Sequence, residues 1–395
     1  MAFERENAEL NIPSVQEIRE MLSVSAVSRL SAYSQAEELD MTTMIELAAR
    51  GYFIEKLQLM IELDLNDQIS EDSEVIGLGR AFQQRAFLGL EILALSDNKV
   101  DEIAMTQLLK AVQMGNLSNL RELHLYNSEL YLAGADLLAE ALKSGHLSKL
   151  ELLDMSHNNI GDRGLIAIAD ALSSGQVPEL NAFSIGEKPQ GKGFHSKGAE
   201  AVASMLKSGQ LPRLEVLRLC RVVEEQGMIA IIQALESGLT GDFKALDLFM
   251  CEIGLEASKS LAKTLRSSSF MSLSLLCVCD SPSMGDEGVS LVLDALSSGN
   301  TSNLKTLQLS NVQMRDEGWA KMAGLLEAGH LPHLVCLNGK DDAPLSETSA
   351  QALAKAYQTN NSLNVQLSVV WPNRSIQTQV RKLQRRNSYR LNIAE

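Results

Sequence analysis

The sequence predicts an α/β solenoid, a curved stack of similar units in which parallel strands form the concave face and helices form the convex face. Two observations lead to this prediction. An apolar phrase of the form L-x-x-L-x-L returns about every 30 residues, and a glycine-containing stop phrase precedes most copies of it. One strand and one helix of this size cannot bury their apolar sides alone, but stacked copies share one continuous core.

The strand phrase sets the frame of the prediction. By period-two alternation, positions 1, 4 and 6 of each phrase face the core, and positions 3, 5 and 7 face the concave side. A last strand is expected within SLNVQLSVV at 362–370. The preceding copies are MIELDL (60–65), LEILAL (90–95), LRELHL (120–125), LELLDM (150–155), LNAFSI (180–185), LEVLRL (214–219), FKALDL (from 243), FMSLSL (from 270), LKTLQL (from 304) and the degenerate LVCLNG (from 334).

A helix is expected after each strand and is expected to end at a glycine. Segments such as GLIAIADALSSG at 164–175 repeat apolar residues at spacings of three and four, which is typical of a helix with one buried face. The closing glycine suits the left-handed residue that follows many helices. Asp162, Asp286 and Asp316 each stand two residues before a glycine, and we predict that they are the N-caps of their helices.

The unit LELLDMSHNNIGDRGLIAIADAL at 150–172 resembles the repeat of leucine-rich-repeat proteins of the ribonuclease-inhibitor-like class. The resemblance covers about ten copies, and it implies that an asparagine after each strand bridges backbone groups of the turn. Asn98 and Asn158 hold that place, and Cys251 is an accepted substitute. The residues that depart from the pattern there, so that the backbone needs other partners, are Gln68, Ser128, Val222 and Val312.

Three segments follow from this frame. Residues 1–56 lack the strand phrase and are predicted to form a helical N-terminal cap, and residues 57–370 hold the repeats. Residues 371–395 are rich in arginine and lysine with a single acid, Glu395. This basic segment is either a capping helix with a basic face or a flexible tail that contacts a partner or the acidic body.

Composition limits the class of partner. The chain has 395 residues, of which 45% are hydrophobic, enough for a large folded body, and its net charge is −15. That charge argues against binding of nucleic acid or of anionic membranes and favours a protein partner with a basic surface. We find no signal peptide and no apolar run long enough for a membrane span, so a cytoplasmic monomer is expected, or a protein secreted into a host cell without a cleavable signal peptide. Five cysteines without framework spacing indicate reduced thiols, and no metal or cofactor is expected.

One cluster of polar residues resembles a catalytic site. Asp154, Ser156 and His157 lie within four positions, which raises a hydrolytic triad or, with Asp162, a metal site. A triad needs side chains that converge from separated elements, whereas near neighbours on one strand diverge. We therefore interpret these residues as exposed, repeat-variable positions and predict that the chain is not an enzyme. The long insertion GEKPQGKGFHSKG at 186–198 lacks the order of a phosphate-binding loop and is interpreted as a turn on the rim.

The remaining candidate is a binding surface on the concave wall. Aromatic, Met and Arg residues, which are enriched in interface cores, gather there, and acidic residues of the first units (Glu62, Asp64, Asp67, Asp97 and Glu122) would steer a basic partner. The alternative is that the apolar members only pack against neighbouring strand side chains. Cys220 and Leu276 are also expected on this wall. The predicted partner-binding residues are Tyr126, Leu152, Asp154, His157, Val216, Arg218, Arg221, Asp247, Phe249 and Met250.

These features favour a protein-protein interaction scaffold without catalysis. An alternative is a regulator of a small GTPase, because the length of the repeat region resembles that of Ran GTPase-activating proteins. The basic tail departs from the acidic tail of that family, and no matching arginine motif is present, so no catalytic residue is carried over. A further alternative is a bacterial effector translocated into a host cell, which resembles many stand-alone repeat proteins of this kind.

Overall fold

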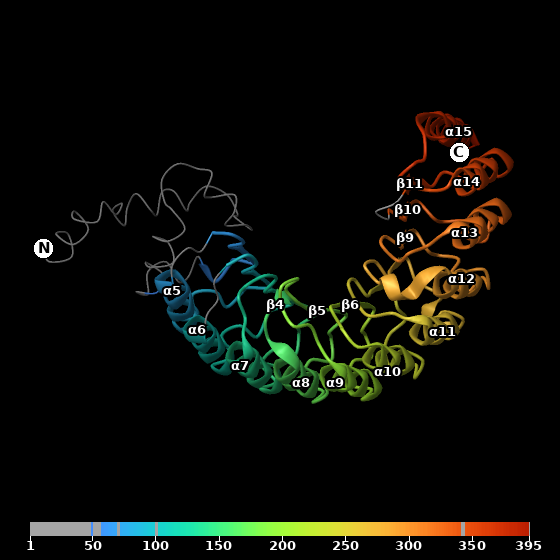
Figure 1. Cartoon of the computed structure of the whole chain (residues 1–395). Coiled ribbons are helices and arrows are strands. Elements are labelled where there is room, and N and C mark those ends of the chain that lie inside the picture. Colours follow the sequence, from blue (N-terminus) through green and yellow to red (C-terminus); the bar gives the residue numbers. More distant parts are fainter. Residues whose placement is uncertain (1–48, 50–56, 69–71, 99–101, 341–343, 395) are drawn as a thin grey trace, which may run out of the picture.

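The protein is described from a computed structural model over residues 57–68, 72–98, 102–340 and 344–394, together with Ala49. The N-terminal cap predicted for residues 1–56 lies outside these residues, Ala49 excepted. Within the described part, strands and helices alternate along the chain and bend into one arc, with the strands on the inner side and the helices on the outer side (Figure 1). The two ends of the arc stand apart, so the inner face is open (Figure 1).

All described strands belong to one parallel sheet whose order follows the sequence from β1 to β11. The strands are β1 (Glu62–Asp64), β2 (Ile92–Ala94), β3 (Glu122–His124), β4 (Leu152–Asn158), β5 (Ala182–Glu187), β6 (Val216–Cys220), β7 (Ala245–Asp247), β8 (Leu275–Cys277), β9 (Thr306–Gln308), β10 (Cys336–Asn338) and β11 (Gln366–Ser368). The helices are α5 (Asp72–Gln83), α6 (Glu102–Gln113), α7 (Leu132–Lys143), α8 (Gly161–Leu172), α9 (Ser196–Lys207), α10 (Glu225–Leu235), α11 (Leu255–Thr264), α12 (Gly285–Leu296), α13 (Asp316–Ala328), α14 (Glu347–Thr359) and α15 (Arg374–Ala394), with short 3-10 turns η2 (Ser268–Phe270) and η3 (Pro282–Met284).

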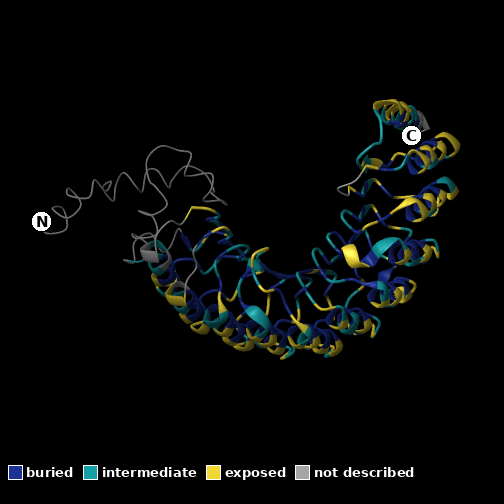
Figure 2. Ribbon diagram, in the orientation of Figure 1, coloured by how far each residue is buried: buried dark blue, intermediate teal, exposed yellow. Residues whose placement is uncertain are grey.

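The register of the sheet confirms the predicted fold class. Position 4 of each strand pairs with position 4 of the next. Leu63 pairs with Leu93, Leu123 with Leu153, and Leu153 with Phe183. These side chains are fully buried between the strands and the helices. Buried residues line the inner sides of the helices, and exposed residues lie on their outer sides (Figure 2).

The frame predicted for the eighth strand is wrong by three residues. The sequence offers two apolar frames, FMSLSL from 270 and LSLLCV from 273, and the structure uses the second, because Leu276 pairs with Leu246 at position 4. Phe270 lies instead in η2 and stacks on Phe243 with ring centroids 5.4 Å apart. Leu276 therefore points into the core with no exposed surface, not into the concave wall.

The glycines of the stop phrase end the helices as predicted. Gly145, Gly175, Gly209 and Gly329 all have positive φ, between 70° and 78°, a conformation that residues with a Cβ adopt at a cost. Gly329 is the left-handed C-cap of α13. The spacing of these glycines along the sequence thus fixes where each strand begins.

The prediction that Asp162, Asp286 and Asp316 cap their own helices is wrong. The helix α8 begins at Gly161, so Asp162 is already inside its first turn. Its carboxylate oxygen accepts a hydrogen bond of 2.8 Å from the backbone N–H of His195, the residue before α9. The aspartate therefore satisfies a free N–H group at the start of the next helix in the stack.

The other two aspartates also reach the next repeat. Oδ1 of Asp286 accepts from the backbone N–H groups of Arg315 and Gly318, at 2.9 and 2.8 Å, at the start of α13. A Cβ atom on Gly318 would lie only 2.6 Å from that oxygen, which explains the glycine two residues after the helix start. Asp316 in turn accepts from the hydroxyl of Ser349 in α14. The spacing D-x-G within one repeat therefore reflects a hydrogen bond to the next repeat, which cannot be recognised from the sequence of one repeat alone.

The turns after the strands are bridged as the resemblance implies. The amide of Asn158 accepts from the backbone N–H groups of Ser128 and Leu130 and donates to the carbonyls of Leu125 and Met155. Where the asparagine is absent, other side chains make part of these bonds. Ser128 donates to Leu95 O, Cys251 to Leu219 O, and Ser281 to Cys251 O.

The basic segment after residue 371 contains the helix α15, which packs on α14. Val380 and Ile376 are buried against the repeat core, and Nδ2 of the buried Asn387 donates to the backbone carbonyls of Tyr357 and Leu363. Arg381 and Lys382 remain exposed on the same helix. The described residues 374–394 are thus one helix that packs on the last repeat and carries exposed basic side chains.

Candidate binding surface on the concave sheet

Three parallel rows of side chains form the concave face of the sheet. They stem from positions 3, 5 and 7 of the strands, and the pairing register aligns each row across neighbouring repeats. Hydrogen bonds between backbones extend the alignment past the strand ends, for example from Leu125 N–H to Asp154 O and from Arg221 N–H to Phe249 O. All ten predicted partner-binding residues lie on or beside this face. Arg218 is exposed, and the other nine are half-buried.

The central part of the concave face, formed by β5, is recessed because its side chains are small. Ala182, Ser184 and Gly186 of β5 are all buried. A Cβ atom on Gly186 would lie 2.4 Å from Cβ of Cys220, so the glycine allows the two strands to approach. Larger side chains from β3 and β4 stand on one side of this stretch, and those from β6 and β7 stand on the other.

Tyr126 and His157 form an aromatic pair on the first side. Their ring centroids are 4.8 Å apart with a tilt of 41°, within the range of favourable aromatic contacts. Burial lowers the pKa of His157 below its ordinary value, and Lys188 lowers it further, although Asp154 and Asp97 act in the opposite sense. Burial, and then Asp97 and Asp154, raise the pKa of Tyr126. The pair therefore presents a neutral imidazole and a neutral phenol at pH 7.

The cluster of Asp154, Ser156 and His157 is arranged differently from a hydrolytic triad. The hydroxyl of Ser156 donates to Asp154 Oδ1 at 2.6 Å, and the backbone N–H of Ser156 donates to the same oxygen at 3.0 Å. The imidazole lies against Tyr126 instead of between the serine and the carboxylate. A nucleophile that donates directly to a carboxylate lacks the intervening base that such a mechanism requires.

Arg218, Asp247 and Phe249 form the second side. Arg218 and Asp247 are neighbours in the position-5 row because their strands pair at these residues. Oδ1 of Asp247 accepts from the backbone N–H of Phe249 at 3.2 Å, so this carboxylate is partly held by its own strand. Among the described residues no carboxylate lies within ion-pair distance of the Arg218 guanidinium, which is exposed. A cation, an acid and an aromatic ring are thus available at one place on the wall.

Arg221 and Met250 stand where the chain leaves the strand. Both residues adopt the left-handed conformation, with φ of 68° and 56°, as does His157 with φ of 59°. The guanidinium of Arg221 donates to the backbone carbonyls of Pro189 and Gly191 in the long insertion. It therefore holds that loop on the rim, a role the sequence did not reveal.

Glu187 is a second anchor of the insertion that sequence reasoning missed. Its side chain is buried, and Oε1 accepts from the backbone N–H of Gly161 at the start of α8, at 2.6 Å. The positive end of the helix dipole stabilises a carboxylate at this place. Phe194, at the other end of the loop, is buried in the core. The sequence offers only an acidic residue at the start of a glycine-rich insertion as a signal, because the partner of Glu187 comes from the preceding repeat.

The cysteines of the wall are buried beneath the larger residues. Cys220, predicted on this wall, is only 8% exposed, and burial raises the pKa of its thiol to about 11. Cys277 and Cys279 hydrogen-bond to each other, and this bond together with burial raises the pKa of the Cys277 thiol. All five cysteines are free thiols. Cys220, Cys251 and Cys277, whose thiol pKa values burial raises, fill space between the rows instead of offering reactive thiolates.

The acidic residues of the first units line the same face. Glu122 pairs with His124 at 3.0 Å, and Asp97 accepts a hydrogen bond of 2.7 Å from Asn127. Asp64 accepts from the backbone N–H of Asn66 at 3.1 Å. Over the described ranges, no group of three or more His, Cys, Asp or Glu side chains is arranged to hold a metal ion. The helices in the same ranges are all too short or too polar to cross a membrane.

A leucine-rich repeat family model matches residues 146–169, the segment that contains β4 and most of α8. The chain has the architecture of a leucine-rich repeat protein. Among solved structures, an internalin from Listeria monocytogenes is similar, with a TM-score of 0.41 and 15% sequence identity, and the match covers 87% of this chain and 94% of that chain. A search of the curated proteins gave no match.

Proposed function

We propose that this leucine-rich repeat protein is a non-enzymatic scaffold that binds a partner protein through the central concave wall, and that its repeats are of the ribonuclease-inhibitor-like class. One observation carries the binding site. Tyr126 and His157 on one side of β5, and Arg218 and Phe249 on the other, present aromatic rings and a guanidinium on one face. Such side chains provide most of the binding energy in protein interfaces when a partner desolvates them.

The charge of the wall favours a partner with a basic surface. Acidic side chains precede the central residues along the arc, at Asp64, Asp97 and Glu122. A field of one sign beside an interface accelerates encounter with a partner of the opposite charge and disfavours a like-charged one. The chain as a whole, with a net charge of −15, acts in the same direction.

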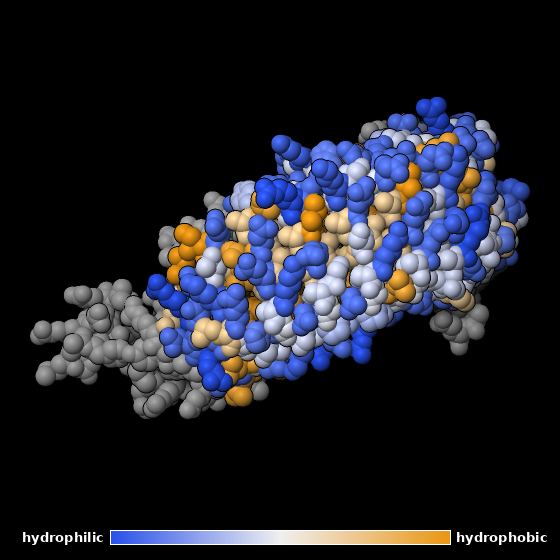
Figure 3. Space-filling model, turned by 90° about the horizontal axis from the view of Figure 1, so that it is seen from below, coloured by the Kyte–Doolittle hydropathy of each residue, from blue (hydrophilic) through white to orange (hydrophobic). Residues whose placement is uncertain are grey.

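The convex face has a different character. Figure 3, in which the helices are seen from outside, shows hydrophilic side chains across this face with hydrophobic residues in narrow strips between them. Single exposed apolar side chains such as Ile166, 39% exposed, are ordinary on a protein surface. The convex helices therefore supply suitable control positions for a binding experiment.

The test begins with affinity purification of the full chain, with cross-linking, from its native cell to identify a partner. The variant Arg218→Glu with Phe249→Ala is expected to weaken binding of that partner by about 100-fold, since two central contacts are removed and one charge is reversed. Its melting temperature should stay close to that of the parent, because neither side chain is in the core. The matched control Lys207→Glu, on the outer side of α9, should bind as the parent does. Equal binding by the double variant would refute the concave site.

The regulator of a small GTPase remains the alternative, and it makes a different prediction. A scaffold leaves the rate of GTP hydrolysis by purified small GTPases unchanged, whereas an activating protein raises that rate by several orders of magnitude. A measured acceleration that survives Arg218→Glu would replace the scaffold by this alternative.

A further inference from the structure

Among the described residues, the last strand of the sheet, β11, pairs with β10 on one side and with no strand on the other. Because the strands are parallel, alternate residues of β11 direct their backbone N–H and C=O groups to opposite sides. Gln366 donates to Val335 O, and Ser368 O accepts from Gly339 N–H, so these two residues face β10. Leu367 and Val369 therefore direct their backbone groups away from the sheet. Among the described residues, none bonds to the outward groups of these two.

The helix α15 occupies only part of this edge. Gln384 Nε2 donates to Val365 O at 2.8 Å, and Ser388 reaches Asn364, so the C-terminal half of the helix covers the start of the strand. Gln377 and Arg381 belong to the same stripe of the helix, one and two turns earlier. Among the described residues no strand follows α15, and the stripe that Gln377, Arg381 and Gln384 form on this helix is polar.

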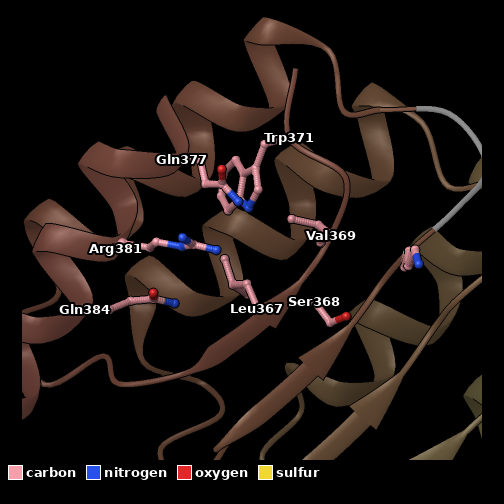
Figure 4. Close-up of a pocket in the computed structure, with 8 residues that line it drawn as sticks. Leu367, Ser368, Val369, Trp371, Gln377, Arg381 and Gln384 are labelled. Atoms are coloured by element: carbon pink, nitrogen blue, oxygen red, sulfur yellow. The ribbon is translucent and has the colours of Figure 1, made fainter. Parts of the chain in front are cut away.

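A pocket of about 300 Å³ lies between this stripe and the free edge (Figure 4). Leu367 and Val369 form its floor, Trp371 closes one end, and Gln377 and Arg381 come from α15. In Figure 4 the guanidinium of Arg381 points from the helix toward Leu367. Free backbone groups, apolar side chains and two cations, Arg381 and Lys340, thus face the same space.

The charge around the pocket is opposite to that of the chain. The sequence of α15 holds six arginine or lysine residues and no acidic residue, while the chain as a whole has a net charge of −15. Arg381 has no carboxylate within ion-pair distance among the described residues. A positive field at this end disfavours pairing of two copies through the same edge and favours a negatively charged occupant.

We propose that the outer edge of β11 accepts an extended acidic peptide segment of a partner protein as an additional strand, with a carboxylate of the peptide held by Arg381. Free backbone groups of an edge strand give affinity to such an added strand, and neighbouring side chains give the specificity. The strand itself carries neither proline nor lysine, the residues that commonly protect an edge from pairing. This surface is separate from the concave wall, so either proposal stands or fails without the other.

The experiment selects ligands for the full chain from a displayed library of random octapeptides. Enrichment of sequences with Asp or Glu and β-branched residues, and without proline, is expected. Their affinity should fall by about tenfold for Arg381→Gln, because a charge-assisted hydrogen bond is lost. The matched control is Lys382→Gln, since Lys382 lies on another side of α15, and it should leave the affinity unchanged.

Two further variants separate strand pairing from simple charge attraction. Leu367→Pro removes the outward N–H while the bonds of Gln366 and Ser368 to β10 remain, so the variant should fold and lose peptide binding. N-methylation of alternate peptide residues should also abolish binding if the backbone pairs with the edge. The variant Arg218→Glu should bind the selected peptides as the parent does.

Three results would overturn the proposal. Peptides without acidic enrichment, or peptides that bind Leu367→Pro and Arg381→Gln as well as the parent, would show that the edge is not the site. A dimer of the full chain in sedimentation velocity that Leu367→Pro dissociates would identify a second copy as the occupant. If Leu367→Pro melts far below the parent, the N-methylated peptides test strand pairing instead. Undiminished binding of these peptides to the parent protein would refute strand pairing.

Discussion

Replacing Asn158 by alanine should remove the best-connected side chain of the repeat turns. The side chain is 1% exposed and makes four hydrogen bonds of 3.0 Å or less, two from backbone N–H groups and two to backbone carbonyls. At about 1 kcal/mol for each net hydrogen bond, the free energy of unfolding should fall by about 4 kcal/mol. The control is the half-buried Asn119, which donates to Leu88 O and accepts from the exposed side chain of Lys149, and Asn119→Ala should cost about 1 kcal/mol because only the first of these bonds is to the backbone.

Urea unfolding followed by circular dichroism measures the total loss, and hydrogen exchange locates it. The amides of Ser128 and Leu130 donate to Asn158, so their exchange should accelerate most in the variant, while amides of β9 and β10 stay protected. A loss below about 1 kcal/mol, or unchanged protection of those two amides, would show that water or neighbouring groups replace the asparagine.

Three further predictions concern the wall and its thiols. Met250→Asn should raise the free energy of unfolding by about 0.5 kcal/mol, because Met250 has φ of 56° and asparagine tolerates this conformation better; a fall in chemical denaturation would contradict this. Because burial lowers the folded-state pKa of His157, the native state binds fewer protons than the unfolded chain at acidic pH. The stability that this residue contributes is therefore complete above the pKa of His157 in the unfolded chain, and it is lost as the pH falls from that pKa toward the lower pKa of the folded state. NMR titration of the imidazole, with His157→Phe as the control, can check this. Iodoacetamide at pH 8 should leave Cys251, whose pKa burial raises to about 12, unmodified while the half-exposed Cys336 reacts; mass spectrometry showing equal labelling would contradict this.

The repeat frame could be predicted from the sequence because each strand repeats the same local pattern. Leu93, Leu123 and Leu153 stand in register along the chain as they do in the sheet. The frame failed only at the eighth strand, where Phe270 imitates the first leucine three residues before Leu273. The spacing of apolar residues fits both frames of the eighth strand equally well. The correct frame is determined only by the pairing of β8 with β7.

Contacts between repeats could not be predicted in the same way. The partners of Asp162, Glu187 and Arg221 lie 26 to 33 residues away, in neighbouring units, so no short motif contains both ends of these bonds. The positions of the candidate binding residues followed from alternation along the strands. Their pairing, as of Tyr126 with His157, depends on which side chains adjacent strands bring together.

The carboxylates that cap neighbouring helices limit how this protein can be shortened or rearranged. Asp162 serves α9, Glu225 accepts from Ala257 N–H in α11, and Asp286 serves α13, so the chemistry that starts one helix is encoded in the preceding unit. Deleting a whole repeat would keep the strand register. The helix after the deletion would then start beside the side chain of a different unit, which does not reach its free backbone N–H groups. Because each capping carboxylate lies 32 or 33 residues before the backbone N–H that it serves, exchange of a single unit separates such pairs at both junctions. Recombination should therefore exchange blocks of several units and restore the carboxylate of the preceding unit at each junction.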